Sequence, residues 1–172
     1  FAPPPQLYVF GGGHVGAQIC RLAHNVGFRV VVVDDRPYFA GRDRHPDADE
    51  CIVDEIAAVF DRIPIDDQTY IVAATRGHEH DEVVVERAIA TRARYVGMLG
   101  SERKKRVLWQ RIEGRGGSRA RLDGVYAPVG LNIGADTPEE IAVSVVGELI
   151  DVRRSARRKP WKTKRPFVTA GD

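Results

Sequence analysis

Short runs of apolar residues alternate along the chain with longer segments whose apolar residues recur every three to four positions. The short runs have the length of buried strands, and the longer segments have the spacing of helices that bury one face. The runs that predict strands are 7–10, 30–33, 50–53, 69–74 and 95–99. The segments that predict helices are 16–26, 56–63, 83–92, 101–113 and 137–152. Because strands and helices alternate, the pattern predicts an α/β fold in which helices cover both faces of a doubly wound parallel sheet.

A glycine-rich segment joins the first predicted strand to the first predicted helix, and it reads Gly11-Gly12-Gly13-His14-Val15-Gly16. Its spacing is G-x-G-x-x-G. The first glycine allows a tight turn, the second lets the backbone approach a pyrophosphate, and the third lets the helix pack closely on the strand. The N–H groups at the helix N-terminus would then face the phosphates. We therefore predict a Rossmann-like domain that binds NAD or NADP through these six residues; the alternative is a tight turn without a ligand.

Two acidic residues and an arginine end the second predicted strand: Asp34, Asp35 and Arg36. An acidic residue about 20 positions beyond the glycines is where a ribose hydroxyl is bound in dinucleotide-binding domains. Asp34 fits that place best, and we expect it to favour NAD over NADP. Asp35 comes one residue later and is expected to point elsewhere in the crevice, but Asp34, Asp35 and Arg36 are all candidate cofactor-binding residues. Arg36 could instead contact a 2′-phosphate or a ribose, or it could simply be solvated, so the choice between NAD and NADP stays open.

Polar residues also follow the fourth and fifth predicted strands. Those predicted to contact a cofactor are Thr75, Arg76, His78, Gly100 and Ser101. Because the carboxyl ends of parallel strands share one edge of the sheet, we expect these residues and the glycine turn to line a single crevice. Ser101 is a natural helix N-cap, and the basic residues after it could favour an anion or form a solvated face.

The segment that contains His78, His80 and Asp81 has side chains that can bind metals. A dedicated zinc site usually needs three or four ligands, and nothing in this spacing demands one. We therefore predict no metal site. The alternative is a polar loop in which Asp81 caps the next helix.

An irregular segment at 125–134 precedes a strong helix start, in which Thr137 can cap the helix, Pro138 fits its first position and Glu140 completes a capping box. Two glutamates in the first turn make an anion there less favoured. We therefore expect residues 128–142 to shape the wall of the crevice or a partner surface, or else to close the edge of the sheet.

The composition is that of an ordinary globular protein, with 172 residues, 43% of them hydrophobic and 29% charged. No apolar stretch is long enough for a transmembrane helix, and the N-terminus is not a signal peptide, so we expect a cytoplasmic protein without membrane contact.

Residues 1–5 are predicted to be a proline-rich linker and 6–153 the folded domain. Residues 154–172 are predicted to be a basic, disordered tail that could attract an acidic partner, with nucleic acid not expected. The two cysteines are expected to be reduced, buried thiols.

Five stretches of the sequence resemble one known family. They are 10–16, 33–37, 78–81, 95–101 with the basic run that follows, and 128–142. Together they resemble the Rossmann-like C-terminal domain of the XdhC/CoxI family, the xanthine dehydrogenase accessory proteins, and the resemblance covers about residues 7–153. This chain departs from the family pattern at Gly12, where alanine is frequent, and at 75–78, where the family has Thr-His-Asp-His-like residues. The second departure weakens any transfer of site roles to that loop.

The resemblance implies a chaperone that binds the molybdenum (pterin) cofactor, supports its sulfuration together with a cysteine desulfurase, and hands it to a molybdenum hydroxylase of the xanthine dehydrogenase type. The family's N-terminal domain has no counterpart in this sequence, which fits a linker at residues 1–5. The alternatives are an NAD(P)-dependent oxidoreductase and a nucleotide-sensing regulatory module that acts through contacts in a homodimer. An oxidoreductase needs a substrate domain and a proton relay, and little of the chain remains for them once the sheet is built.

Overall fold

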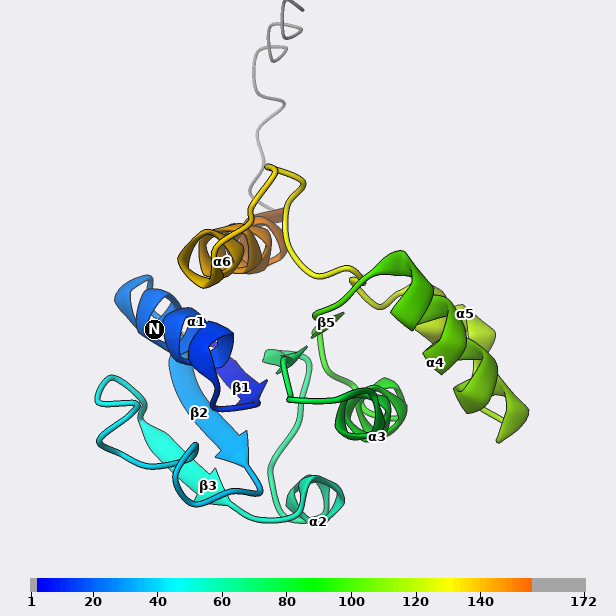
Figure 1. The fold of residues 1–172 in the computed structure, drawn as a ribbon, viewed down its shortest axis with the longest axis horizontal. Coiled ribbons are helices and arrows are strands. Elements are labelled where there is room, and N and C mark those ends of the chain that lie inside the picture. Colours follow the sequence, from blue (N-terminus) through cyan, green and yellow to red (C-terminus); the bar gives the residue numbers. More distant parts are fainter. Residues whose placement is uncertain (1–2, 156–172) are drawn as a thin grey trace, which may run out of the picture.

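The computed structural model describes residues 3–155 and contains a parallel sheet of five strands in the order β3-β2-β1-β4-β5 (Figure 1). The strands are β1 (Gln6–Phe10), β2 (Arg29–Asp34), β3 (Glu50–Val53), β4 (Thr69–Ala73) and β5 (Tyr95–Met98). The helices are α1 (His14–Asn25), α2 (Ile56–Phe60), α3 (His78–Ile89), α4 (Glu102–Gly114), α5 (Arg119–Asp123) and α6 (Pro138–Arg154). The predicted α/β fold with a doubly wound parallel sheet is therefore confirmed.

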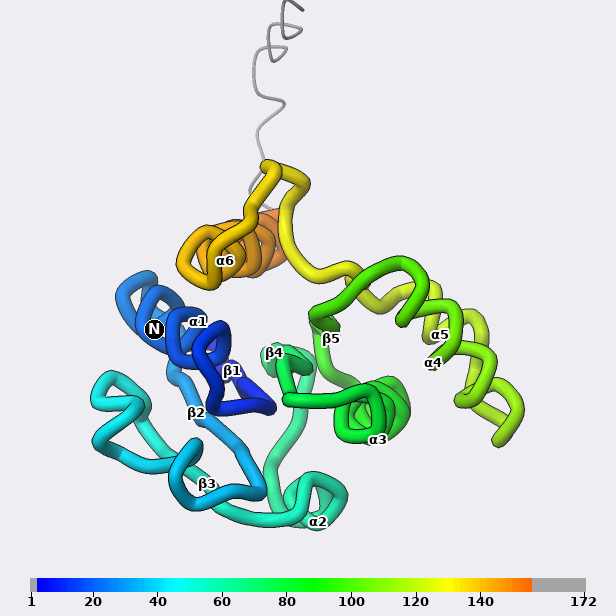
Figure 2. The backbone as a smooth tube through the Cα atoms, in the orientation of Figure 1, coloured from blue at the N-terminus to red at the C-terminus, as the bar shows by residue number. Residues whose placement is uncertain are grey.

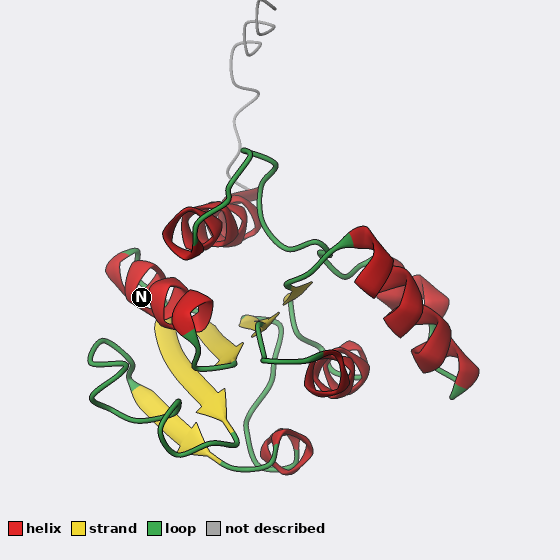
Figure 3. Ribbon diagram, viewed as in Figure 1, coloured by secondary structure: helices red, strands yellow, loops and turns green. Residues whose placement is uncertain are grey.

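Two hydrophobic cores lie on opposite faces of the sheet, because side chains alternate along each buried strand. In β1, Leu7 and Val9 face α1 and α6, whereas Tyr8 and Phe10 face the core that α2 and α3 cover. Figure 3 shows this layering, with helices above and below the strands, and α4 and α5 packed beside α3. The cores hold the carboxyl ends of all five strands at one edge, where the predicted site residues lie.

Helix α2 ends at Phe60 rather than at 63, one further helix begins earlier than predicted, and one was not predicted. Helix α3 begins at His78 rather than at 83, because its first turn is polar and gives no apolar periodicity. The short helix α5 was not predicted, since only Leu122 is buried in it. The predicted Ser101 cap and the Thr137–Glu140 capping box are both present.

The connection between α5 and α6 runs past the outer side of β5 and crosses to the opposite face of the sheet, as Figure 2 shows. Tyr126 forms a parallel bridge with Gly97, and Val129 N–H donates to the Met98 carbonyl at 2.9 Å. This segment therefore lies along β5 through an isolated bridge and backbone hydrogen bonds, and delivers α6 to the side of α1.

Within residues 3–155, no helix is long and apolar enough to cross a membrane. Cys20 is buried and Cys51 is half-buried, and both are free thiols. The predicted basic tail lies, from residue 156 onward, outside the described residues.

Candidate functional site

The site lies where the strand order changes direction. The chain passes from β1 to β2 on one side and from β4 to β5 on the other, so β1 and β4 flank the switch point of the sheet. In open α/β sheets, ligands bind in the crevice outside the carboxyl ends of the strands at this point. The helices that follow these two strands, α1 and α3, both begin at this crevice.

The three glycines of the predicted motif have different structural roles. A Cβ on Gly11, whose φ is 117°, would lie 2.0 Å from the Ala74 carbonyl oxygen, and one on Gly16 would lie 1.9 Å from the Gly11 carbonyl oxygen. Both glycines are therefore required by the packing of the turn. A Cβ on Gly13 would meet no atom within 4 Å, and Gly13 has a φ of −70°. The fold therefore does not require glycine at position 13, and the space beside this residue is open.

Helices α1 and α3 share a second property. Their N-caps are Gly13 and Gly77, and neither helix has a side-chain cap. By contrast, Ser101 and Thr137 cap α4 and α6 with their hydroxyl groups. The first-turn N–H groups at the switch point thus lack the side-chain acceptor that the other two long helices have, which leaves them to water or to an anion.

The 36–49 segment folds onto the glycine turn and, together with Asp34, binds the main-chain N–H and carbonyl groups of Gly12. Gly12 N–H donates to Asp34 Oδ2 at 2.9 Å, and Arg44 Nε donates to the Gly12 carbonyl at 2.6 Å. A Cβ on Gly12 would lie 1.7 Å from the Phe39 carbonyl oxygen. Neither Arg44 nor Phe39 was predicted as a site residue, because both lie in irregular backbone without periodicity or a known spacing.

The Asp34 carboxylate is buried and accepts four hydrogen bonds. Oδ1 accepts from Arg36 N–H and Nε, both at 3.0 Å, and Oδ2 accepts from Gly12 N–H at 2.9 Å and from Arg36 Nη2 at 3.1 Å. Burial alone would raise the pKa of Asp34, but the hydrogen bonds from Arg36 and Gly12 outweigh it and lower the pKa to about 2. Asp34 is therefore ionised at neutral pH, and in this structure its carboxylate holds Gly12 and Arg36 in place.

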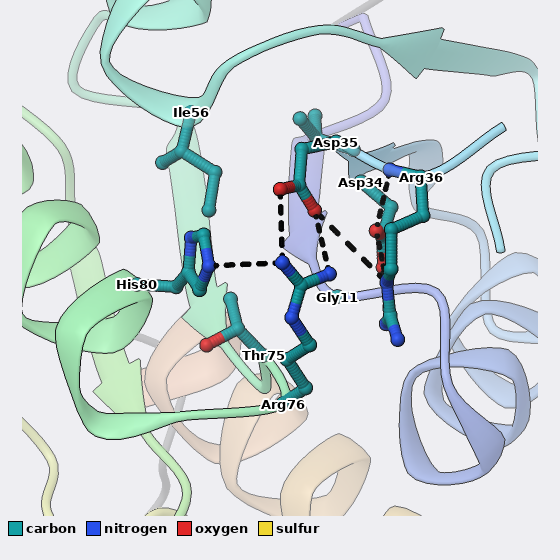
Figure 4. Close-up of a pocket in the computed structure, with 9 residues that line it drawn as sticks. Gly11, Asp34, Asp35, Arg36, Ile56, Thr75, Arg76 and His80 are labelled. Carbon is teal, nitrogen blue, oxygen red and sulfur yellow. Dashed lines mark hydrogen bonds and ion pairs between the residues drawn. The ribbon is translucent and has the colours of Figure 1, made fainter.

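Asp35 does point away from Asp34, as expected, but it points across the crevice. Arg76 donates to both of its oxygens, at 3.1 and 3.2 Å, and to His80 Nε2 at 3.3 Å (Figure 4). This bridge joins the end of β2 to the loop after β4. The three residues of this bridge also line a cavity of about 10 Å³, together with six others that include Gly11 and Thr75. Such a cavity holds at most one water molecule.

A buried ion pair ties the loops after β4 and β5 together. Asp81, which is 1% exposed, accepts from Thr75 N–H at 3.0 Å and from Thr75 Oγ1 at 2.6 Å. Lys104 Nζ donates to the same carboxylate and, at 2.8 Å, to the Leu99 carbonyl. The alternative in which Asp81 caps α3 is wrong, because the cap is Gly77 and Asp81 turns inward. The sequence did not identify Lys104 as the partner of Asp81, because the two residues lie 23 positions apart.

The remaining predicted residues lie at the rim of the crevice. His14 is exposed, and its Nε2 lies 3.1 Å from Glu139 Oε1, which joins the first turns of α1 and α6. Val15 is half-buried, His78 is exposed, and Ser101 uses its hydroxyl to cap α4. No cluster of three or more potential metal ligands occurs among residues 3–155.

The segment predicted to shape a wall lines an open groove. Residues 128–135, Leu99 and the start of α6 enclose about 630 Å³ beside the end of β5. Glu148 fixes this wall from beneath by accepting from Tyr95 OH at 2.6 Å and from Gly130 N–H at 3.1 Å. Leu131 and Ile133 remain exposed at its rim, with exposed fractions of 42% and 57%.

The parallel sheet, the glycine turn and the two uncapped helices at the switch point define a Rossmann-type α/β domain. The model of the family described as the XdhC Rossmann domain matches residues 7–149, and the chain belongs to this family. The resemblance carried by the five sequence stretches is therefore confirmed.

Two longer proteins are related to this chain over most of its length. A probable xanthine dehydrogenase subunit from Bacillus subtilis (strain 168) is 36% identical over 153 residues, which are 88% of this chain and 44% of that protein. The uncharacterized protein YqeB of Escherichia coli (strain K12) is 28% identical over 155 residues, which are 88% of this chain and 28% of that protein. This chain thus spans less than half the length of either relative.

The crystal structure of a xanthine dehydrogenase from Bacillus halodurans has the same architecture. It superposes with a TM-score of 0.82 at 36% sequence identity, over 91% of this chain and 46% of that chain. The chuY protein of E. coli strain CFT073 shares the fold alone, with a TM-score of 0.50 at 18% identity, over 86% of this chain and 90% of that chain.

Proposed function

We propose that this domain binds a phosphorylated cofactor at the glycine turn and assists the maturation of a molybdenum hydroxylase of the xanthine dehydrogenase type. Its membership in the XdhC Rossmann domain family supports a role beside xanthine dehydrogenase, and two similar proteins carry that enzyme's name. The ligand is either a dinucleotide, NAD or NADP, or the molybdenum cofactor, because all of them present phosphate to the protein.

The observation that carries the proposal is the open space at Gly13. This residue and the uncapped first turn of α1 leave backbone N–H groups at the switch point open to a phosphate. The residues that would hold the phosphates are Gly13, His14, Val15 and Gly16, through their main chain. When bound, the molybdenum cofactor supplies the redox centre of the hydroxylase; the part of this chain is to hold, orient and release it.

The partners in this proposal are the molybdenum hydroxylase and a cysteine desulfurase, in the cytoplasm, with a homodimer as the assembly to test. The open groove at 128–135 and the exposed Leu131 and Ile133 offer a surface for such contacts. An exposed apolar patch rimmed by polar residues is typical of an interaction site.

The test compares Gly13→Val with Gly114→Val. A Cβ would meet no atom within 4 Å at either position, but Gly114 ends α4, away from the glycine turn. We expect Gly13→Val to abolish calorimetric binding of pyrophosphate, NAD(P) and the molybdenum cofactor while its melting temperature matches that of Gly114→Val. Native mass spectrometry of the purified protein identifies any ligand that remains bound.

Equal binding by both variants would contradict the proposed site. Turnover of NAD(P)H with an added substrate would instead support the oxidoreductase, and ligand-dependent oligomerisation without turnover would support the regulatory module.

A further inference from the structure

The end of β2 gathers arginine side chains around one aromatic ring beside the glycine turn. The Arg36 guanidinium lies 3.7 Å from the centroid of Phe39, and that of Arg44 lies 5.1 Å from the same centroid. Both arginines are also attached to the turn: Arg44 donates to Gly12, and Arg36 binds the carboxylate that holds Gly12. The two guanidinium groups are thus held in place next to the proposed phosphate site.

Asp34 has no acceptor position left for a ribose. An ionised carboxylate offers about four lone-pair positions. Arg36 occupies three of them and Gly12 N–H occupies the fourth. A ribose diol could bind Asp34 only by displacing a bidentate, charge-assisted fork, which is among the stronger hydrogen-bond arrangements in proteins.

The arginines, by contrast, retain donors. The Arg36 Nη1 group makes no hydrogen bond to any described residue, and its side chain is 31% exposed. Within residues 3–155, no carboxylate forms a salt bridge with Arg44. Its Nε donates to the Gly12 carbonyl, and its two terminal nitrogens make no hydrogen bond to a described residue. The charged groups at this place are three arginines (Arg36, Arg44 and Arg76) and two aspartates (Asp34 and Asp35), so their net charge is +1.

We infer that the end of β2 binds a phosphoryl group, read by Arg36 and Arg44, and that Asp34 is a positioning residue which fixes Arg36 and the glycine turn. The cofactor then carries a second phosphoryl group beyond its pyrophosphate, as a 2′-phosphorylated dinucleotide such as NADP does. This reverses the preference for NAD that the sequence position of Asp34 suggested. The inference rests on the proposed binding of a phosphorylated cofactor and specifies its chemical class.

Calorimetric titration of the full chain with NADP, NAD and inorganic pyrophosphate tests the inference. We expect the wild-type protein to bind NADP about tenfold or more tightly than NAD, as one additional charge-assisted contact implies. Arg36→Ala removes a phosphoryl ligand and frees two acceptor positions on Asp34 for ribose hydroxyls, since the main-chain N–H of residue 36 remains. Its ratio of NAD to NADP dissociation constants is therefore expected to fall to about one or below, a change of preference that simple loss of structure does not produce.

The matched control is Arg29→Ala, which removes the same charge from the opposite end of β2 and is expected to retain the wild-type preference. If the wild-type protein binds both dinucleotides and prefers NAD, or if Arg36→Ala keeps the NADP preference, the inference is overturned while the proposed function stands. If pyrophosphate, NAD and NADP all fail to bind the wild-type protein, the phosphate site itself is overturned, and the inference falls with it.

Discussion

Asp34 stands where the sequence motif places an acidic residue, but its role depends on neighbours that the motif does not specify. Arg36 lies two positions away and turns back onto the carboxylate, while Phe39 supports the guanidinium from the other side. A spacing rule identifies the strand end and the residue type there. It does not determine which donors reach the carboxylate, because that depends on the course of the following loop.

The lowered pKa of Asp34 predicts a loss of stability in acid. Its pKa is about 2 in the folded protein against an ordinary value of 3.8, so the folded state binds the proton less readily than the unfolded state. The stabilisation is therefore complete above about pH 4 and is lost as the pH falls towards 2, with a size of about 2 kcal/mol. Urea unfolding as a function of pH measures it.

The Asp34→Asn variant identifies the source of this pH dependence. It should be less stable than the wild-type protein at pH 7 and should lose most of the slope between pH 4 and 2. A variant that keeps the full slope would show that other carboxylates are responsible.

At the scale of elements, local patterns identified the buried strands and the capped helices, and missed what tertiary packing decides. The Thr137–Glu140 box works within four residues, so it can be read from the sequence and is present. The start of α3 could not be read, because His78 to Asp81 is polar and is stabilised by a partner 23 residues further on, Lys104.

The ion pair between Asp81 and Lys104 is predicted to stabilise the loops that border the crevice. Both side chains are largely buried, and removal of one partner leaves the other charge unpaired, which costs about 3 kcal/mol or more. Lys104→Met and Asp81→Asn should each lower the free energy of unfolding by that order. Arg103→Met, one position earlier and exposed, should have little effect.

The double variant Asp81→Asn/Lys104→Met separates a paired interaction from two independent ones. Because the second substitution removes the unpaired charge left by the first, the total loss should be well below the sum of the single losses. Additive losses in urea unfolding would mean that the two side chains stabilise the protein separately.

For the whole molecule, the sequence was sufficient to predict the parallel sheet, its family and the edge at which the site lies. It was not sufficient for the contacts across that edge. The Arg44–Gly12 contact and the Asp35–Arg76 bridge join residues 32 and 41 positions apart, and the groove at 128–135 lies in irregular backbone. Contacts of this kind cannot be predicted from the periodicity of apolar residues or from the spacing of a motif.

The groove at 128–135 is predicted to contribute to binding rather than to stability. Asn132 lines it and is exposed, so Asn132→Ala should leave the free energy of unfolding nearly unchanged but weaken binding of the cofactor or of the hydroxylase. Thr137→Ala removes the cap of α6 and should do the opposite, with a loss of about 1 kcal/mol and little change in affinity. Parallel unfolding and binding measurements on both variants check this; unchanged binding by Asn132→Ala would make the segment architectural.

The close approach of Gly12 to Phe39 couples the glycine turn to the loop that follows β2. A Cβ at residue 12 would lie 1.7 Å from the Phe39 carbonyl oxygen, so the present course of the 36–49 segment is incompatible with a side chain there. Any substitution of Gly12 therefore requires this segment to take another path, and with it the arginines that it presents.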